Sequence, residues 1–393
     1  MKEYTVDDCF FHIQNGANIK QGIVDGGYPI TRIETISNDV FNRDRVGYAG
    51  ITELGKYEAY VLEDMDLLMS HINSVQYLGR TVLYRKEENE TIIHGMNLLR
   101  LKARAEIINP AYARYYFYCQ NFREQVSRIT KKSVNQASFA VNDLKKIKLR
   151  IPELQKQDEI VAMLDRVQKV IDMRKVELEG LDNLIKSRFV EMFGLPDINP
   201  MGWEEKPLSE YLDVIGGYAF KSELFVDEGI PVLRIGNINA GYFKPVNMVY
   251  WEDDSKLERY KMYAGDLVMS LTGTVGKDDY GNVCILGKEY DVYYLNQRNA
   301  KLDLKQGLNK YYLSYLLKFE QIKKQLTGIS RGVRQANISN KDILNLCVPI
   351  PAMEKQGEFE RFVTQVTKLK FEVQKSLDET QILMDSLMQQ YFG

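Results

Sequence analysis

Residues 151–194 read IPELQKQDEIVAMLDRVQKVIDMRKVELEGLDNLIKSRFVEMFG, and residues 350–393 repeat this plan as IPAMEKQGEFERFVTQVTKLKFEVQKSLDETQILMDSLMQQYFG. The two segments lie 199 positions apart, so that Lys156-Gln157 aligns with Lys355-Gln356 and both segments end in Phe-Gly. After the initial proline, apolar residues recur at alternating steps of four and three, which is the heptad pattern of a long helix. About 40 residues at 1.5 Å each predict a rod of roughly 60 Å.

The apolar stripe of each predicted rod is narrow, and a narrow stripe is buried best against another helix. The other copy is the economical partner, and a pseudo-twofold relation between the halves would make the pair an antiparallel coiled coil. The stripe residues expected to form this spacer and to contact partner proteins are Leu164, Val167, Ile171, Leu178, Val363, Val366, Leu377 and Leu387.

The duplication continues upstream of the rods. Asp66-Leu67-Leu68-Met69-Ser70 corresponds to Asp266-Leu267-Val268-Met269-Ser270, and Gln136 corresponds to Gln335. Each front combines short strand patterns broken by glycine with helical patterns, at 109–127 and 309–326. We therefore expect a mixed α/β fold with an internal repeat, in which two tandem α/β domains are each followed by a long helix. The expected boundaries are 1–150, 151–194, 195–348 and 349–393, with the Gly- and Pro-rich joint at 194–202.

The composition is that of a globular protein, with 393 residues of which 45% are hydrophobic. No apolar run reaches the roughly 18 residues of a membrane helix, and the first residues do not resemble a signal peptide. The four cysteines and three histidines show no metal-ligand spacing, so we expect reduced cysteines in a cytoplasmic protein and no bound metal. A net charge of −2 gives no overall attraction to nucleic acid, so any DNA-binding face must be local.

Each half runs through a basic loop that contains a glutamine, then an Ile-Pro segment, then the heptad helix. The loops are Lys131-Lys132-Ser133-Val134-Asn135-Gln136 and Arg331-Gly332-Val333-Arg334-Gln335. This order resembles the DNA-specificity subunit of type I restriction–modification systems over essentially the whole chain. Residues 203–208, 217–222 and 265–277 look like the opening of a target-recognition domain of that family. The first half departs from the pattern, because Met65 stands where Gly265 would be and the Gly-rich loop is absent.

The resemblance implies a non-catalytic protein in which each front reads one half of a bipartite, gapped site in double-stranded DNA. The rods would set the gap, and methylation subunits, expected to be two, would dock together with restriction subunits. It also implies that S-adenosylmethionine, ATP and Mg²⁺ are bound by those partners, and that this chain binds no cofactor and no membrane.

The candidate DNA contacts follow from side-chain chemistry, because Arg reads guanine, Asn and Gln read adenine, and Lys, Ser and Thr bind phosphates. A basic stretch at 102–132 recurs in the second half, although such a stretch can also be a solvated helix face. Residues 272–277 fit either a phosphate contact or a hairpin turn, and Arg32 and Arg234 fit either phosphate contact or packing. The candidates are Arg32, Lys131, Lys132, Gln136, Arg234, Thr272, Thr274, Lys277, Arg298, Arg331, Arg334 and Gln335.

Three motifs superficially suggest catalysis. Asn109-Pro110-Ala111-Tyr112 lacks one proline of the adenine-methyltransferase loop. Pro196-Asp197 with Glu204-Glu205-Lys206 fits a nuclease pattern, but the carboxylates of a nuclease must lie on adjoining strands to bind a metal, whereas these residues flank a turn. Residues 273–277 lack the first glycine and the final Ser or Thr of an ATP-binding loop. The leading hypothesis is thus a DNA reader. A coiled-coil scaffold and a methyltransferase–nuclease fusion are the alternatives.

Overall fold

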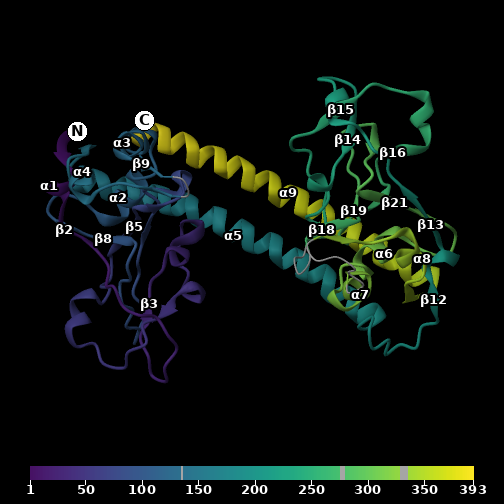
Figure 1. The fold of residues 1–393 in the computed structure, drawn as a ribbon, viewed down its shortest axis with the longest axis horizontal. Helices are drawn as coiled ribbons and strands as arrows, with labels where there is room; N and C mark the ends of the chain where they lie inside the picture. Colours follow the sequence, from purple (N-terminus) through teal and green to yellow (C-terminus); the bar gives the residue numbers. More distant parts are fainter. Residues whose placement is uncertain (134–135, 275–278, 328–334) are drawn as a thin grey trace. The chain divides into compact units, whose positions relative to one another are not determined.

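The computed structural model describes residues 1–133, 136–274, 279–327 and 335–393. The chain forms two compact units, one made of residues 1–175 and 375–393 and the other of residues 176–374. Each unit therefore combines one front with part of each long helix, α5 (Leu154–Phe193) and α9 (Met353–Phe392) (Figure 1). The four-segment division expected from the sequence stays a prediction.

The elements of the two fronts follow a similar but not identical order. Those of the first front are β1 (Lys2–Thr5), α1 (Val6–Cys9), β2 (Phe10–Asn15), β3 (Pro29–Ile30), β4 (Gly47–Tyr48), β5 (Leu67–Ser70), β6 (Ile72–Asn73), β7 (Thr81–Leu83), β8 (Leu98–Ala103), α2 (Pro110–Tyr116), α3 (Gln120–Ile129), β9 (Lys131–Lys132), β10 (Ala137–Ser138), α4 (Val141–Lys145) and β11 (Lys148–Ile151). Those of the second are β12 (Glu205–Pro207), β13 (Leu212–Gly216), β14 (Ile230–Leu233), β15 (Val249–Trp251), β16 (Lys261–Tyr263), β17 (Leu267–Ser270), β18 (Thr272–Thr274), β19 (Val283–Ile285), β20 (Val292–Leu295), β21 (Asn299–Leu304), α6 (Lys310–Leu316), α7 (Glu320–Thr327), β22 (Gln335–Asn337), α8 (Asn340–Leu344) and β23 (Cys347–Pro349). The mixed α/β class and the internal repeat are confirmed.

A four-stranded antiparallel sheet forms the centre of each front, with the order β2-β8-β5-β7 in the first and β13-β21-β17-β19 in the second. Alternate residues of a strand face opposite sides of a sheet. Leu67 and Met69 pack into the core shared with the helices, whereas Leu68 packs into a separate cluster on the other side. Both sides of the central strand are therefore buried, which explains its unbroken apolar run.

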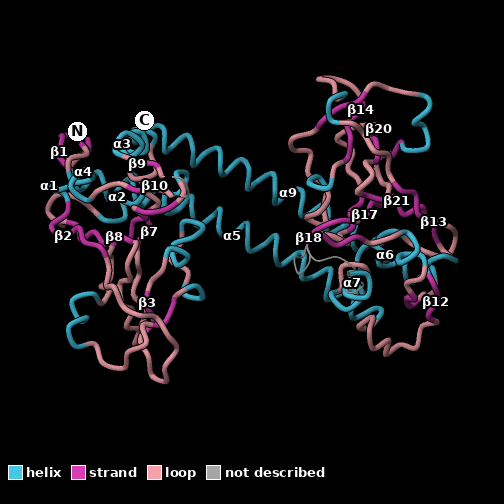
Figure 2. The backbone as a smooth tube through the Cα atoms, in the orientation of Figure 1, coloured by secondary structure: helices cyan, strands magenta, loops and turns pink. Residues whose placement is uncertain are grey.

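The second front carries a further sheet of order β15-β14-β20-β16, in which β14 and β20 pair in parallel. Figure 2 shows β14 and β20 as a group of strands above β17 and β21 in this view. This part of the front has its own aromatic core, with the Phe220 and Trp251 ring centroids 5.0 Å apart. In the first front the corresponding region is reduced to the two-stranded pair β3-β4 and isolated bridges.

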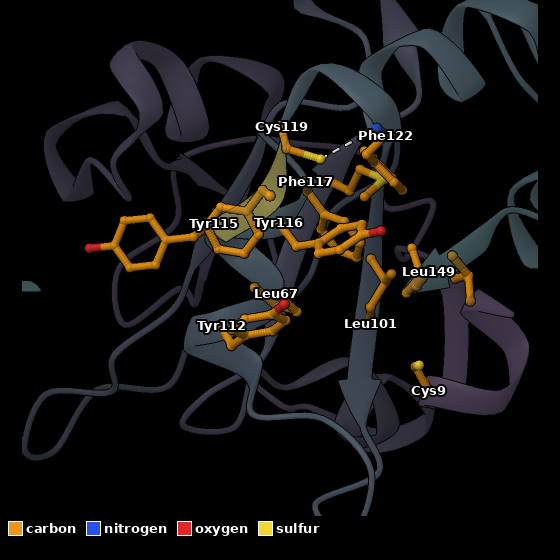
Figure 3. Close-up of a cluster of buried hydrophobic side chains, with 14 of the residues drawn as sticks. Cys9, Leu67, Leu101, Tyr112, Tyr115, Tyr116, Phe117, Cys119, Phe122 and Leu149 are labelled. Atoms are coloured by element: carbon orange, nitrogen blue, oxygen red, sulfur yellow. Dashed lines mark hydrogen bonds between the residues drawn. The ribbon is translucent and has the colours of Figure 1, made fainter. Parts of the chain in front are cut away.

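The helical stretch expected at 109–127 is divided into α2 and α3, so the expectation of a continuous helix is wrong here. Cys119 caps α3, and its Sγ accepts a hydrogen bond from the backbone N–H of Phe122 at 3.4 Å (Figure 3). The bend brings the rings of Phe117 and Phe122 to a centroid separation of 4.4 Å inside the core. The second front is divided in the same way into α6 and α7.

The long helices pack antiparallel within each unit, as predicted. In the first unit Ile160 and Leu164, early in α5, share a core with Met384 and Phe392, late in α9. In the second unit Asp182 of α5 forms an ion pair with Lys370 of α9. The predicted stripe residues Leu164, Val167, Ile171, Val363 and Val366 are buried, and Leu178, Leu377 and Leu387 are half-buried.

The Phe-Gly ends of the repeats dock onto aromatic residues of the fronts. The ring of Phe392 lies 5.3 Å from that of Tyr112 and 5.8 Å from that of Tyr116, centroid to centroid. In the second unit Phe193 lies 4.8 Å from Tyr312, the counterpart of Tyr112. Each front is thus closed by the end of the helix that belongs to the other repeat.

A buried glutamine joins each front to the start of its own long helix. The Gln157 Oε1 accepts from the Asn109 N–H at 2.8 Å, and its Nε2 donates to the carbonyls of Ile107 and Pro152 at 3.0 and 2.9 Å. Gln356 makes the same three bonds, to the Asn309 N–H at 2.8 Å and to the carbonyls of Gly307 and Pro351 at 3.3 and 2.7 Å. Both glutamines are completely buried. The glutamine of the Lys-Gln pair shared by the repeats therefore has a structural role in both.

The turn before the central strand is preserved despite the substitution of glycine by methionine. Met65 has φ +68° and Gly265 has φ +90°. The N–H of each donates to the carbonyl of the residue that directly follows the neighbouring strand, Tyr84 after β7 or Leu286 after β19. A non-glycine residue adopts this region at a cost of roughly 1 kcal/mol. The tertiary pairing of the strand outweighs this cost. In the part of the chain that the structure describes, no helix is both long and apolar enough to cross a membrane.

We predict that Gln157→Ala lowers the free energy of unfolding by about 3 kcal/mol, because it leaves a buried N–H and two buried carbonyls without partners. Gln155→Ala is the matched control, since Gln155 lies two residues earlier and is exposed. Urea unfolding of both variants measures the difference. Equal stabilities for the two variants would contradict the role assigned to Gln157.

Candidate nucleic-acid interface

A short β-ribbon extends from the end of the central strand in each front. In the first front β6 pairs with β10, which also pairs with β9. In the second front β18 pairs with β22, with Thr272 opposite Asn337 and Thr274 opposite Gln335. The ribbon brings together the chain after the central strand and the basic loop, two segments that the sequence analysis selected separately. These paired strands are called the first ribbon and the second ribbon below.

One side of each ribbon is packed against the domain. In the first ribbon Ala137 is buried, and Phe139, two residues further along, is buried as well. In the second ribbon a Cβ added at Gly273 would lie 2.3 Å from the Asp279 Oδ1 and 2.7 Å from the Tyr280 Cβ, so this side has no room for a side chain. Burial raises the pKa of Tyr280, and its hydroxyl donates to the Thr327 carbonyl at 3.1 Å.

The other side of each ribbon carries the polar side chains, because neighbouring residues of a strand point to opposite sides. Ser74 and Gln136 are exposed in the first ribbon, and Ser138 is half-buried. In the second ribbon Thr274 and Asn337 are exposed and Thr272 is half-buried. Because these residues alternate with the packed ones, each ribbon has one side available for a ligand.

The first ribbon contains three of the predicted DNA contacts. Lys131 and Lys132 form β9 and are exposed, and Gln136 immediately precedes β10 and is exposed too. Ser133 closes the hairpin, because its N–H and its hydroxyl both donate to the Gln136 carbonyl at 2.7 Å. Two ammonium groups and an amide therefore lie on one short, backbone-paired segment.

The second ribbon contains Thr272, Thr274 and the backbone of Gln335. The Thr274 N–H donates to the Asp279 Oδ1 at 2.8 Å, which fixes the end of β18. Arg298 is exposed and adjoins the root of the ribbon, since its carbonyl accepts from the Leu271 N–H at 2.9 Å. The other predicted contacts of this front, Lys277, Arg331 and Arg334, lie outside the described residues.

Arg32 and Arg234 occupy equivalent positions in other sheets, after β3 and β14. The backbone N–H of Arg32 donates to Thr35 Oγ1 at 2.8 Å, and that of Arg234 donates to Asn237 Oδ1 at 3.0 Å. The Arg32 side chain donates to Gln21 at 2.5 Å, and the Arg234 side chain donates to the Asn247 carbonyl. The structure does not place these two arginines on the ribbons, and their role in binding stays a prediction.

Several cations of the stretch 102–132 make contacts within the protein. Lys102 pairs with Glu63 at 2.5 Å and holds the pKa of that carboxyl below its ordinary value. Arg123 donates to the Leu78 carbonyl at 2.8 Å, and Arg114 donates to the Asp39 carbonyl at 3.4 Å. The local positive charge is therefore more dispersed than the sequence suggested, and Lys131 and Lys132 are its exposed part on the first ribbon.

The Asn109-Pro110-Ala111-Tyr112 motif forms a helix start. The Asn109 side chain accepts from the N–H groups of Ala111 and Tyr112 at 2.8 and 3.3 Å and donates to Asp158 at 2.7 Å. Asn309 caps α6 in the same way, which supports the structural interpretation of both sites. Among the described residues, no group of three or more His, Cys, Asp or Glu side chains is placed to hold a metal ion.

Two polar residues on the available side of the ribbons were not selected from the sequence. Ser138 and Asn337 lie 199 positions apart, which is the offset of the repeat. Each follows the repeated glutamine, Gln136 or Gln335, by two residues and directly precedes a buried apolar residue. The alternation of polar and apolar residues in Gln136-Ala137-Ser138-Phe139 was the signal in the sequence that could have indicated a strand with one polar side. It is too short to be distinguished from a loop without the pairing partner.

Comparison with known proteins identifies the family. The model of the type I restriction modification DNA specificity domain matches residues 1–183 and again residues 200–380. The putative type I restriction enzyme MjaX specificity subunit of Methanocaldococcus jannaschii is 28% identical over 363 residues, which cover 88% of this chain and 81% of that protein. The EcoAI specificity subunit of Escherichia coli is 28% identical over 197 residues, which cover 48% of this chain and 33% of that protein.

Solved structures have a similar fold. The S subunit of a type I restriction–modification system from M. genitalium aligns with a TM-score of 0.57 and 15% identity, and the alignment covers 100% of this chain and 96% of that one. At that identity the likeness concerns the fold alone. Because the family model matches both repeats over most of their length, the chain belongs to the family of type I restriction–modification DNA specificity domains and contains that domain twice.

Proposed function

We propose that this chain is the sequence-reading subunit of a type I restriction–modification complex, and that each front reads one part of a bipartite, gapped DNA site. The observation that carries this proposal is the recurrence of the family's DNA specificity domain in both halves. The two ribbons support it, since each exposes polar or basic side chains at the same place in its front. A coiled-coil scaffold would leave these duplicated ribbons without a role.

The chain would contribute recognition, and the catalytic steps would belong to its partners. We propose that methylation subunits, two per chain, and restriction subunits dock on it in the cytoplasm. S-adenosylmethionine, ATP and Mg²⁺ would be bound by those subunits. The paired helices would set the number of base pairs between the two parts of the site.

Lys131→Ala is expected to weaken DNA binding by the complex assembled with methylation subunits, because Lys131 is paired with Ser138 and therefore lies on the available side of the first ribbon. Loss of one phosphate contact lowers the slope of log K against log salt by about 0.9. Fluorescence anisotropy at several salt concentrations measures both the affinity and the slope. Lys146→Ala is the matched control, because Lys146 is an exposed lysine at the end of α4. An unchanged slope for Lys131→Ala would place this ammonium group away from the DNA.

Exchanging the two fronts at the Ile-Pro junctions before the long helices should exchange the order of the two half-sites. The exchange is sterically reasonable because Gln157 and Gln356 join the fronts to the helices by the same three hydrogen bonds. Sequencing of methylated positions in cells that carry the exchanged chain gives the new site. A site with the original order would contradict the assignment of one half-site to each front.

A further inference from the structure

The second ribbon has the form of an element that can enter the major groove of DNA. The major groove of B-DNA is about 12 Å wide and admits a two-stranded β-ribbon. The second ribbon is such a pair, with cross-strand partners whose Cβ atoms lie roughly 5 Å apart. The packed side, with Gly273 against Asp279 and Tyr280, excludes side chains, so only the opposite side can meet a ligand.

The two ribbons share a backbone arrangement but differ in side-chain chemistry. Thr272 and Asn337 are paired across the second ribbon. Their counterparts in the first ribbon are Ile72 and Ser138, which are likewise paired. A threonine–asparagine pair is thus replaced by an isoleucine–serine pair at the same place. Residues that read different bases must differ in this way, so the difference fits a pair of positions that reads bases.

The hydrogen-bonding capacity of Asn337 separates base reading from phosphate binding. A carboxamide presents one acceptor and two donors in a plane, which matches the N6 and N7 edge of adenine, whereas a phosphate offers only acceptors. Asn337 carries no charge and is exposed beside the half-buried hydroxyl of Thr272. In the first ribbon the Ile72 methyl groups could contact only an apolar group, such as the C5-methyl group of thymine.

We propose that Asn337 is a specificity-determining residue that reads an adenine in the half-site of the second front. Ser138, together with Ile72, occupies the equivalent reading position of the first front. This inference rests on the proposed function, because it presupposes that the fronts read DNA. It adds which side of which strands enters the major groove and which base one residue recognises.

The test is the methylated motif produced by the full complex that carries Asn337→Ala. The motif should lose discrimination at a single position of a single half-site, by roughly 5- to 150-fold between adenine and the other bases. The other half-site should stay as it is in the wild type. Asn337→Asp should favour cytosine at the same position, because a carboxylate accepts from the cytosine N4 amino group. Asn345→Ala, at an exposed asparagine after α8, is the matched control and should leave the motif unchanged.

Three outcomes would overturn the inference. An unchanged motif with Asn337→Ala in an active complex would place the residue away from the bases. Equal weakening on all sequences, with a reduced salt slope, would make it a phosphate contact. If the wild-type chain itself produced no bipartite motif, the proposed function would fail, and the inference would fail with it. Co-purification of each variant with its methylation subunits shows that the variant is folded, and Asn337→Asp supplies a gain of preference that misfolding cannot imitate.

Discussion

The structure depends on a buried glutamine that appears twice. Gln157 and Gln356 each accept a hydrogen bond from one N–H at the start of a front helix and donate to two carbonyls, and both side chains are fully buried. An isolated buried amide is costly, so this side chain is tolerated only when all three partners are in place. Because the same residue lies in the first turn of a long helix, the hydrogen bonds fix the orientation of each front on the helix that follows it.

The ends of the long helices complete the attachment and explain why the sequence repeats as it does. Phe392 packs on Tyr112 and Tyr116, and Phe193 packs on Tyr312 in the other unit. Each front is thus held by the beginning of its own helix and by the end of the other. With the fronts held at their bases, the ribbons that leave the central sheets are free to vary in side chains. This separation of a constant attachment from a variable surface suits a family of proteins that read different DNA sequences.

Much of the fold could be predicted from the sequence because its signals are long or duplicated. The heptad pattern predicted the two long helices, α5 and α9, and the matches at an offset of 199 residues predicted the internal repeat. The break between α2 and α3 was missed because Cys119 is a weak capping residue and the bend is stabilised by packing of Phe117 on Phe122. Asn337 and Ser138 were missed because β22 and β10 are too short to show a period. The turn at Met65 was unexpected, since only tertiary pairing holds a methionine at φ +68°.

The central claim is that this chain selects the DNA sequence modified by its complex. Genome-wide mapping of N6-methyladenine, in cells with and without the chain but with its methylation subunit retained, tests this claim most directly. The account predicts that a bipartite, gapped methylated motif is present with the chain and disappears when the chain alone is deleted. Persistence of the same motif without the chain would contradict it, because sequence selection would then belong to another protein.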